Sequence, residues 1–531
     1  MDSVITQRNA GPWAPLASPV FRWLWLASIA SNIGTWMHEV GAGWLMTSLS
    51  ASPLAVAMVQ VAGALPMFFL ALPAGALADI VDKRRYLLWV QAWMACVALT
   101  LAVLTLTGWM SVPVLLILTL CMGIGTALMM PAWSAVTPEV VAKDALPAAI
   151  ALSSLGVNVA RAIGPALAGF LVSLSGPWLT FALNAVSFVA VMVALYCWKT
   201  EVATPLLPAE RLMGAIRAGF RYARSAQPLQ AVLLRTAAFF IGASAGMALL
   251  PILVRKELLG TAADFGVLLG CVGLGAVGGA MVLPKLRRGL SNSTIVALAS
   301  CAYACVLFAL AGVRDFAALI PVMLVSGAAW IAVLSSLQVA AHTAVPTWVR
   351  ARALAVYILV FFGCSALGGI VWGAVASHWS LSVALTAGGA FLLIGVLATL
   401  AVKLPVTAAD DLAPSMHWPA PVLDEHYDCD RGPVMVTIDY DIPLENSEVF
   451  RRAMQFVGGM RRRNGSLSWG LMQDSENPRL WHEFFFDESW LDHLRHHGRV
   501  TRAEQRIEAA ARQYMTPGTE VRIRHYLGKP A

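Results

Sequence analysis

Apolar runs long enough to cross a lipid bilayer recur through the first three quarters of this chain. Each holds about 20 residues, which as a helix covers the roughly 30 Å of hydrocarbon in a membrane. The composition agrees, because 58% of the 531 residues are hydrophobic and 13% are charged, too few for a soluble surface. The sequence therefore predicts an all-α polytopic fold with twelve transmembrane helices, at 23–47, 54–79, 86–107, 112–131, 145–174, 177–198, 229–254, 263–284, 293–313, 316–342, 353–377 and 381–402.

Basic residues gather in every second loop of this predicted topology. Three cations at 83–85 follow the second run, and two at 287–288 follow the eighth. The alternate loops are nearly bare, apart from Arg255 and Lys256 after the seventh run and Arg314 after the ninth. Because cytoplasmic loops are enriched in Lys and Arg, we expect both termini in the cytoplasm. The net charge of +7 largely reflects this asymmetry, so we expect no nucleic-acid partner.

The loop after the second run combines residues that membrane proteins seldom place together without a role. Gly75 allows close helix approach, Asp79 lies at a helix end, and Lys83, Arg84 and Arg85 can anchor to the anionic inner leaflet. These residues indicate a role beyond connecting two helices, and a signal that only fixes topology is the simpler alternative.

The two halves of the membrane region align at an offset of 208 residues. Pro138 aligns with Pro346, and a leucine follows eight residues later in each half, Leu146 and Leu354. Cations follow the second run of each half as well. This repetition predicts two six-helix repeats with a substrate cavity between them.

The predicted domain organisation follows from these runs and from the composition of the segments between them. It consists of a cytoplasmic N-terminal tail (1–22), a six-helix bundle (23–198), a cytoplasmic linker with an amphipathic helix (199–228), a second bundle (229–402), a flexible Pro- and Asp-rich linker (403–432) and a ferredoxin-like domain (433–531). The amphipathic helix either lies on the membrane surface or is a solvated linker.

The fifth run carries polar and helix-breaking residues within an apolar stretch. Asn158 and Arg161 precede Gly164, Pro165 and Gly169. Proline frees a backbone carbonyl, and the glycines allow tight helix packing that limits leakage.

Two charges lie deep inside predicted membrane helices. Arg161 is about sixteen residues into its run, and Glu39 lies well inside the first run. We hypothesise that both face the central cavity and that Glu39 exchanges protons for substrate. A static ion pair, or a carboxylate at the outer mouth, is the alternative. Arg235, near the start of its run, is expected to snorkel to the cytoplasm.

Further polar and aromatic residues are plausible cavity-lining groups, although ordinary helix packing explains each of them as well. Asn32, Asn158 and Gln338 join Glu39 and Arg161 in the predicted substrate and proton pathway. The other candidates are Trp36, Trp44, Asn184, Phe239, Phe240, Trp330 and Ser336.

The loop at 75–85 resembles the loop between the second and third helices of major facilitator superfamily transporters, where it helps lock the outward-facing state. The resemblance implies that Gly75, Asp79, Lys83, Arg84 and Arg85 form a conformational latch. Asp82 departs from that pattern, which often has glycine. The segment from Ala160 to Gly169 resembles the Gly-Pro signature of antiporters in this superfamily, with Ala160 and Ala168 where the strongest matches have glycine. This signature favours export over import.

Several segments read together look like the transmembrane secretion effector branch, which includes enterobactin-type siderophore exporters and macrolide efflux relatives. They are Phe21-Arg-Trp-Leu-Trp-Leu26, Ser31-Asn-Ile-Gly34, Leu65-Pro66, the stretch 72–79, Pro131-Ala-Trp133 and the segment from Ala160 to Gly169. The resemblance covers about residues 15–405. It implies proton-coupled export of a small organic molecule (a drug, siderophore or metabolite) by a multi-pass protein of the bacterial inner membrane, with no catalytic site and no cofactor.

The last hundred residues change character and predict strands and helices in the order β-α-β-β-α-β, a ferredoxin-like sheet. Motifs such as Trp469-Gly-Leu and the run 493–501 resemble dimeric α/β-barrel domains related to antibiotic-biosynthesis monooxygenases. The resemblance implies a homodimer through this domain. The alternative is a membrane-tethered monooxygenase or ligand sensor, with His482, Trp490, His493 and His497 near a pocket.

No metal site is predicted. His493 and His497 are four residues apart on one predicted helix, but no third ligand is spaced convincingly. Seven of the eight cysteines fall in apolar runs, so we predict no disulfide framework. No Gly-rich phosphate loop with Lys-Ser/Thr occurs, which disfavours ATP-driven transport by this chain.

Overall fold

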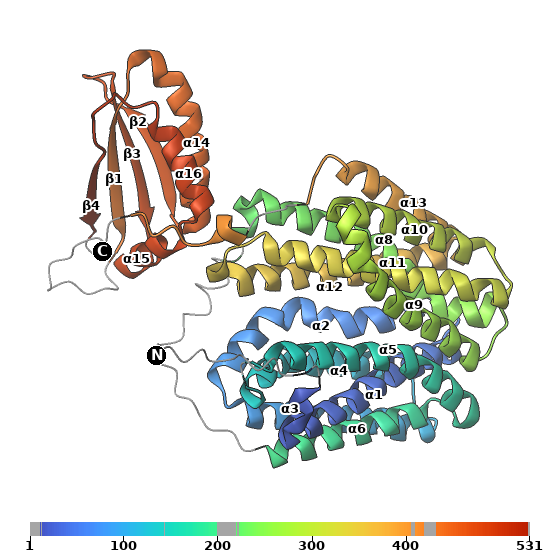
Figure 1. The fold of residues 1–531 in the computed structure, drawn as a ribbon. Coiled ribbons are helices and arrows are strands. Elements are labelled where there is room, and N and C mark those ends of the chain that lie inside the picture. Colours follow the sequence, from blue (N-terminus) through green and yellow to red (C-terminus); the bar gives the residue numbers. More distant parts are fainter. Residues whose placement is uncertain are drawn as a thin grey trace. The chain divides into compact units, whose positions relative to one another are not determined.

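The structure is a computed structural model that describes residues 11, 13–142, 144–198, 219, 222–404, 409–418 and 432–528. The chain divides into two compact units (Figure 1). The helical unit comprises Met1–Ala209, Leu233–Gln338 and Tyr357–Lys403, and the sheet unit comprises Glu210–Val232, Val339–Val356 and Leu404–Ala531. The predicted amphipathic helix near 212–224 and the linker near 403–432 lie largely outside the described residues.

Long helices make up the membrane region, as predicted. They are α1 (Pro19–Leu49), α2 (Pro53–Ile80), α3 (Lys83–Leu106), α4 (Val112–Val140), α5 (Leu146–Ser175), α6 (Trp178–Cys197), α8 (Gln227–Ile252), α9 (Ala262–Gly289), α10 (Asn292–Gly312), α11 (Phe316–Thr343), α12 (Arg350–His378) and α13 (Leu381–Thr399).

Eleven helices in the described part of the chain are long and apolar enough to cross a membrane. Helix α1 is the twelfth long helix but is not among them, because its 31 residues include several polar ones. Polar residues on a membrane helix face the bundle interior or a cavity rather than lipid. The lower hydropathy of α1 is therefore consistent with a helix that lines a central site.

The helices extend beyond the predicted runs, and one difference bears on the repeat. Helix α4 continues through Pro131 to Val140, so Pro138 lies inside its last turns. Pro346, by contrast, lies in the connection before the short helix η3 (Thr347–Val349). The two aligned prolines thus occupy different backbone environments.

Side-chain caps and tight contacts fix the helices of the first half. The Asp82 carboxylate caps α3 by accepting a hydrogen bond from the Arg85 backbone N–H at 2.9 Å. Such a cap satisfies a helix N–H that otherwise has no partner, which is a local reason for aspartate at this position.

Helix α1 packs against α5 and α6, α2 packs against α4, and α3 packs against α4 and α6. The seven described cysteines are all free.

The sheet unit has the predicted β-α-β-β-α-β order (Figure 1). Its elements are β1 (Val434–Asp441), α14 (Ser447–Asn464), β2 (Ser468–Gln473), β3 (Leu480–Asp487), α15 (Trp490–Arg499), α16 (Arg502–Arg512) and β4 (Arg522–Leu527). The sheet order is β2-β3-β1-β4, and every neighbouring pair is antiparallel. Thr501 starts α16 with a capping box to Glu504, which explains the predicted interruption of the second helical segment.

Strand alternation sorts the side chains of β1 and β3 onto two faces. Val434, Val436, Ile438 and Tyr440 of β1 are buried in the hydrophobic core, which also contains Phe450 of α14. The intervening residues of β1 and β3 are half-buried and face the other side of the sheet. One face of the sheet therefore forms the core with the helices, and the opposite face is more open.

A buried ion network ties the helices to this core. Arg461 is 0% exposed and donates hydrogen bonds to Glu483 at 2.9 Å and to Glu508 at 2.6 Å. Tyr440 donates to Glu483 at 2.7 Å. Burial disfavours the charge on Arg461, but the two carboxylates outweigh burial and raise the pKa of Arg461 above its ordinary value. All members of such a network must be paired to be tolerated in a core.

Candidate functional site

A cavity of about 400 Å³ lies inside the helical unit, between the first six long helices and the last six. Residues of α1, α2 and α4 line one side, and residues of α8, α9, α11 and α12 line the other. Most of its walls are apolar or aromatic. The polar and charged lining residues are Thr35, His38, Glu39, Gln60, Thr119, Thr126 and Ser365.

Glu39 is the carboxylate of this cavity wall. It lies within α1, yet its side chain is exposed, because it opens into the cavity rather than onto packed neighbours. Trp36, one turn earlier, also lines the cavity. Glu39 is thus one of the residues that line this cavity.

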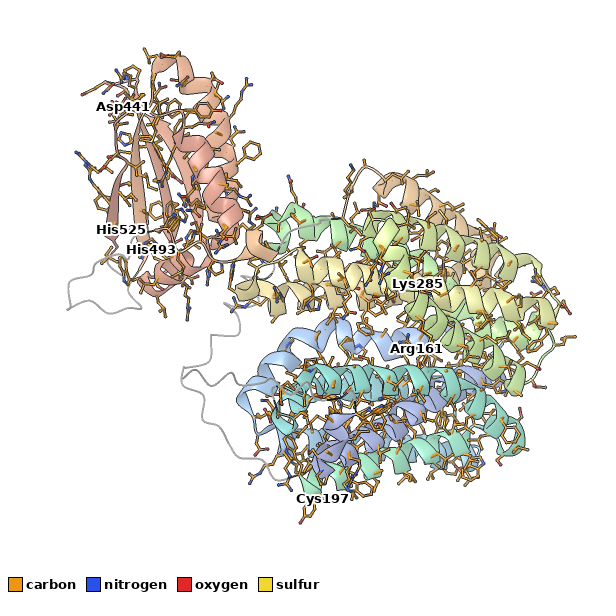
Figure 2. All side chains as sticks on the ribbon, viewed as in Figure 1. Arg161, Cys197, Lys285, Asp441, His493 and His525 are labelled. Carbon is orange, nitrogen blue, oxygen red and sulfur yellow. The ribbon has the colours of Figure 1, made fainter. Side chains whose placement is uncertain are left out.

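Arg161 lies midway along α5, away from the helix ends (Figure 2). Its guanidinium carbon is 5.8 Å from the ring centroid of Trp36, and its charge attracts that of Glu39 through space. Its Nε has no hydrogen-bond partner among the described residues. Arg161 itself is not part of the cavity wall. Its guanidinium lies near the ring of Trp36, which is part of that wall.

The other predicted pathway residues do not line this cavity. The Asn32 side-chain amide donates to the Ser28 carbonyl at 2.8 Å, and that of Asn158 donates to the Ser154 carbonyl at 2.9 Å. Both side-chain amides therefore donate to backbone carbonyls of their own helices. Gln338 is exposed near the end of α11. Of the additional aromatic candidates, Trp36 and Trp330 are in the wall.

His38 and Gln60 were missed as pathway candidates. His38 is 4% exposed, its two ring nitrogens have no hydrogen-bond partner among the described residues, and its ring lies 5.2 Å from that of Phe181. The Oε1 atom of Gln60 is also buried without a partner in the described chain. Both are polar residues inside apolar runs, and that position was the available signal in the sequence.

The glycines of α5 allow two close helix contacts. A Cβ placed on Gly164 would lie 2.7 Å from the Cβ of Trp36 on α1. A Cβ on Gly169 would lie 2.8 Å from the Cα of Gly266 on α9. These positions accept no larger side chain without a helix shift. Helix α5 therefore joins the first half to the second half at Gly169.

Hydrogen bonds also connect the two halves where α1 and α8 end. The Arg255 guanidinium donates to Thr47 Oγ1 at 3.0 Å and to Ser48 Oγ at 2.6 Å, and it lies 5.5 Å from the ring centroid of Trp44. Lys256 donates to the Ala51 carbonyl at 2.7 Å. The sequence had shown these two cations as exceptions in a bare loop. In the structure, Arg255 and Lys256 bind the second half to the first half where α1 and α8 end.

The predicted latch residues bind within the first half. Lys83 forms an ion pair with Glu139 near the end of α4, and Arg84 donates to the Leu195 carbonyl at 2.9 Å and to the Tyr196 carbonyl near the end of α6. Among the described residues, nothing lies within 4 Å of a Cβ placed on Gly75, so the described part of the chain shows no close helix contact at this glycine. The side chain of Asp79 lies outside the described residues.

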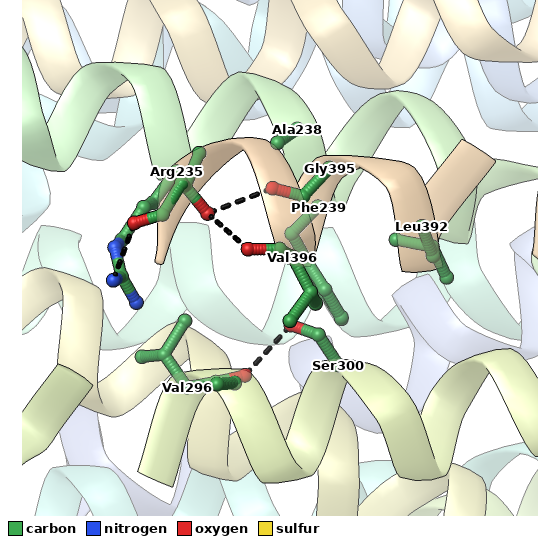
Figure 3. Close-up of a pocket in the computed structure, with 10 residues that line it drawn as sticks. Arg235, Ala238, Phe239, Val296, Ser300, Leu392, Gly395 and Val396 are labelled. Atoms are coloured by element: carbon green, nitrogen blue, oxygen red, sulfur yellow. Dashed lines mark hydrogen bonds between the residues drawn. The ribbon is translucent and has the colours of Figure 1, made fainter. Parts of the chain in front are cut away.

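Arg235 is buried rather than snorkelling, which corrects the expectation. It is 4% exposed and donates to the carbonyls of Val402 at 3.1 Å, Ser293 at 3.2 Å and Thr399 at 2.9 Å. Figure 3 shows Arg235 beside a small hollow of about 10 Å³, with Phe239 and Ser300 in its lining. Carbonyls at a helix end need such donors. Arg235 is therefore a structural cap for the end of α13.

The histidines of the sheet unit fall on different faces of the sheet. His482 lies on the open face, where its Nδ1 is 2.7 Å from the Asp439 carboxylate, and it lines a hollow of about 370 Å³ with Phe484 and Phe486. Trp490 and His493 are buried on α15. The predicted grouping of these residues around one pocket is therefore wrong.

Two six-helix halves around a central cavity define a secondary transporter of the major facilitator class. The chain belongs to the transmembrane secretion effector family, whose model matches residues 10–530 and so includes the sheet unit. The curated relatives are a transporter and an exporter by name, in agreement with the expectation that the chain is not an enzyme.

Two curated relatives are similar in sequence to this chain, and both are named as transport proteins. The staphyloferrin A transporter of Staphylococcus aureus is 24% identical over 284 residues, which is 52% of this chain and 70% of the relative. The enterobactin exporter EntS of Shigella boydii is 25% identical over 282 residues, 53% of this chain and 67% of the exporter. Both proteins handle siderophores by name.

Solved structures show the same fold. A POT family transporter in complex with 5-aminolevulinic acid superimposes with a TM-score of 0.60 at 13% identity, covering 74% of this chain and 97% of that chain. The nucleoside transporter NupG gives a TM-score of 0.58 at 14% identity, with coverage of 72% and 99%. At such identities the likeness concerns the fold alone.

Proposed function

We propose that this chain is a proton-coupled exporter of a small organic molecule, working by alternating access in a bacterial cytoplasmic membrane with both termini in the cytoplasm. The observation that carries the proposal is Glu39, a carboxylate on the wall of a cavity between the two halves. A membrane-embedded carboxylate that reaches a cavity can bind a proton and a substrate in turn. Arg161 supplies the opposing charge nearby.

Alternating access requires contacts between the halves that break and re-form. The bonds from Arg255 and Lys256 to the end of α1 and its following loop, together with the Gly169–Gly266 contact, close the cavity at one end. With cytoplasmic termini, that end faces outward, so the described state is closed to the outside. In the proposed cycle, outward opening breaks the Arg255 bonds, and residues 83–85 stabilise the opposite closure.

The cavity favours a substrate with aromatic or apolar surface and a few polar groups. Trp36, Trp330, Phe265, Phe361 and Phe362 form much of the wall. Such walls bind organic molecules mainly by burial, while scattered polar groups fix orientation. The names of the siderophore-transporting relatives support a siderophore or a metabolite of similar chemistry as the cargo, moved outward.

We further propose that the sheet unit forms a homodimer through its open face. Its exposed apolar residues there include Met472 at 60% and Tyr526 at 44% exposure, beside the half-buried Phe484 and Phe486. An apolar sheet face left open to water is unfavourable, and a second copy presents the same surface.

Uptake into inside-out membrane vesicles tests the proposed function. A panel of siderophores, antibiotics and organic metabolites is offered with and without a protonophore. Accumulation of at least one compound that the protonophore abolishes supports proton-coupled export. Protonophore-insensitive accumulation would refute the coupling, and accumulation only in right-side-out vesicles would refute the direction.

A further inference from the structure

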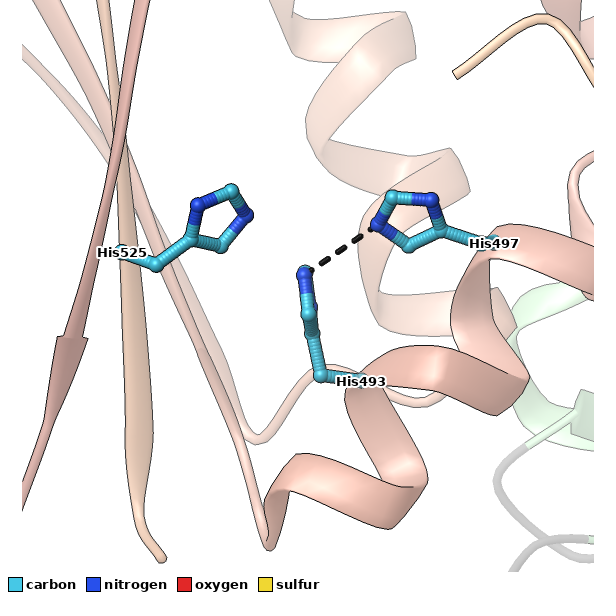
Figure 4. A group of neighbouring side chains, drawn as sticks. All are labelled: His493, His497 and His525. Carbon is cyan, nitrogen blue, oxygen red and sulfur yellow. Dashed lines mark hydrogen bonds between the residues drawn. The ribbon is translucent and has the colours of Figure 1, made fainter. Parts of the chain in front are cut away.

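Three imidazoles from two elements of the sheet unit, a helix and a strand, lie close together. His493 and His497 lie one turn apart on α15, and His525 lies on β4 (Figure 4). One ring nitrogen from each lies within 4.8 Å of the other two. His493 Nε2 and His497 Nε2 are 3.2 Å apart.

Sheet register explains why His525 reaches α15. In the antiparallel pair β1–β4, His525 is opposite Val436, whose side chain is buried on the helix-covered face. Residues directly opposite each other in such a pair point to the same face. His525 therefore points toward α15, and its ring centroid lies 4.8 Å from that of His493.

A carboxylate orients the central imidazole. His493 is 1% exposed, and its Nδ1 lies 2.9 Å from an oxygen of Asp487. An ionised carboxylate only accepts hydrogen bonds, so Nδ1 carries the proton and the Nε2 lone pair faces the other two rings. Metal-ligating histidines commonly have such a carboxylate behind them.

A hydrogen bond between His493 and His497 would account for their 3.2 Å separation. It does not explain why the ring of His525 also lies beside His493, or why the Asp487 carboxylate orients the His493 ring. We propose that His493, His497 and His525 bind a late first-row divalent transition metal ion such as Zn²⁺. Imidazole is a preferred ligand of these ions, and three histidines leave a fourth position open to water or to another donor.

The geometry needs little adjustment. In a tetrahedral site with Zn–N bonds of about 2.0 Å, ligand nitrogens lie about 3.3 Å apart. His493 and His497 already meet this separation, and His525 must close by at most about 1.5 Å. His525 is exposed, so an ion can enter from solvent.

The test uses the full chain, purified in detergent with a histidine-free affinity tag. Bound Zn²⁺ is measured by equilibrium dialysis and mass spectrometry, and Co²⁺ substitution is followed by its visible absorption. We expect one Zn²⁺ per chain and tetrahedral Co²⁺ bands. His525→Gln and His497→Gln should each weaken binding at least about tenfold, whereas His378→Gln on α12 should leave it unchanged.

Two outcomes would overturn the proposal. One is a wild-type chain that retains no Zn²⁺ after dialysis. The other is full Zn²⁺ affinity in both His525→Gln and His497→Gln, which would place any bound ion elsewhere. Because His525 is exposed, its replacement is expected to leave the fold intact, and gel filtration of each variant checks this. If one variant misfolds, the other decides.

Discussion

Gly169 of α5 and Gly266 of α9 face each other so closely that a Cβ on either would lie 2.8 Å from the Cα of the other. This contact joins the two halves of the helical unit on one side of the cavity. It also gives a packing reason for a glycine that sequence resemblance had linked to antiport.

Gly169→Ala should impair transport by forcing these helices apart. Overpacking of this kind costs about 1–3 kcal/mol, so the closed state is disfavoured and the thermal stability of the purified protein falls. Gly278→Ala on α9 is the matched control, because nothing lies within 4 Å of a Cβ there. Equal transport and stability in both variants would show that the close contact has no role.

Arg255→Ala should weaken closure at the end of the bundle where α1 and α8 terminate. The variant loses two side-chain hydrogen bonds from a charged donor. A charge-assisted bond contributes about 1.5–3 kcal/mol, so the open population should rise about tenfold or more. A single cysteine at Met247 in the cavity wall, in a cysteine-free background, reports this as faster labelling by an impermeant thiol reagent.

Arg288→Ala is the control for that experiment, because it removes a cation from the last turn of α9 instead. It should leave labelling at position 247 unchanged. Equal labelling rates in wild type and Arg255→Ala would contradict the assigned closure.

Acid should destabilise the sheet unit through Glu508. Burial opposes ionisation of this carboxyl, but Arg461, His417 and Trp418 outweigh burial and lower its pKa from 4.5 to about 2. A lowered pKa means that the unfolded state binds the proton more readily. Stability is therefore complete above pH 4.5 and is lost as the pH falls toward 2.

Glu508→Gln should remove much of this pH dependence and destabilise the sheet unit by about 3 kcal/mol, because Arg461 keeps only part of its counter-charge. Hydrogen exchange of peptides from the sheet unit, measured in the full chain, localises the effect. Glu448→Gln, whose side chain is exposed, serves as control and should change little. An unchanged exchange rate in Glu508→Gln would contradict the role given to this network.

Met472→Glu should convert the proposed homodimer into monomers, because it places a charge on the open face of the sheet. Phe456→Glu is the control, since Phe456 is equally apolar and 71% exposed but lies on helix α14. Light scattering of the detergent-solubilised chain gives the mass. A monomeric wild type, or a dimer that Phe456→Glu alone disrupts, would refute the proposed interface.

The helices and the order of strands were predictable, because apolar runs of membrane length and strand alternation are properties of sequence alone. The wall of the cavity was only partly predictable. Glu39 was found because a charge in an apolar run must face a cavity or a partner. Asn32 and Asn158 gave the same signal, but their amides bind their own helices.

Three further features were not predicted from the sequence, and all three depend on contacts between segments that are far apart in the chain. Arg235 lies near the start of its helix, but its burial follows from the position of α13. The contact of Arg255 with Thr47 depends on how the halves meet. His525 joins α15 through sheet register, which a sequence pattern alone does not provide.

Proton movement in proteoliposomes tests the central claim most directly. The purified chain is reconstituted, a substrate found in the vesicle screen is added, and a trapped pH dye records proton flux. Wild type should move protons opposite to substrate. Glu39→Gln should abolish this flux while expression stays intact, and Arg161→Gln should slow it about tenfold, equivalent to about 1.4 kcal/mol. Unchanged proton flux in Glu39→Gln would contradict the account.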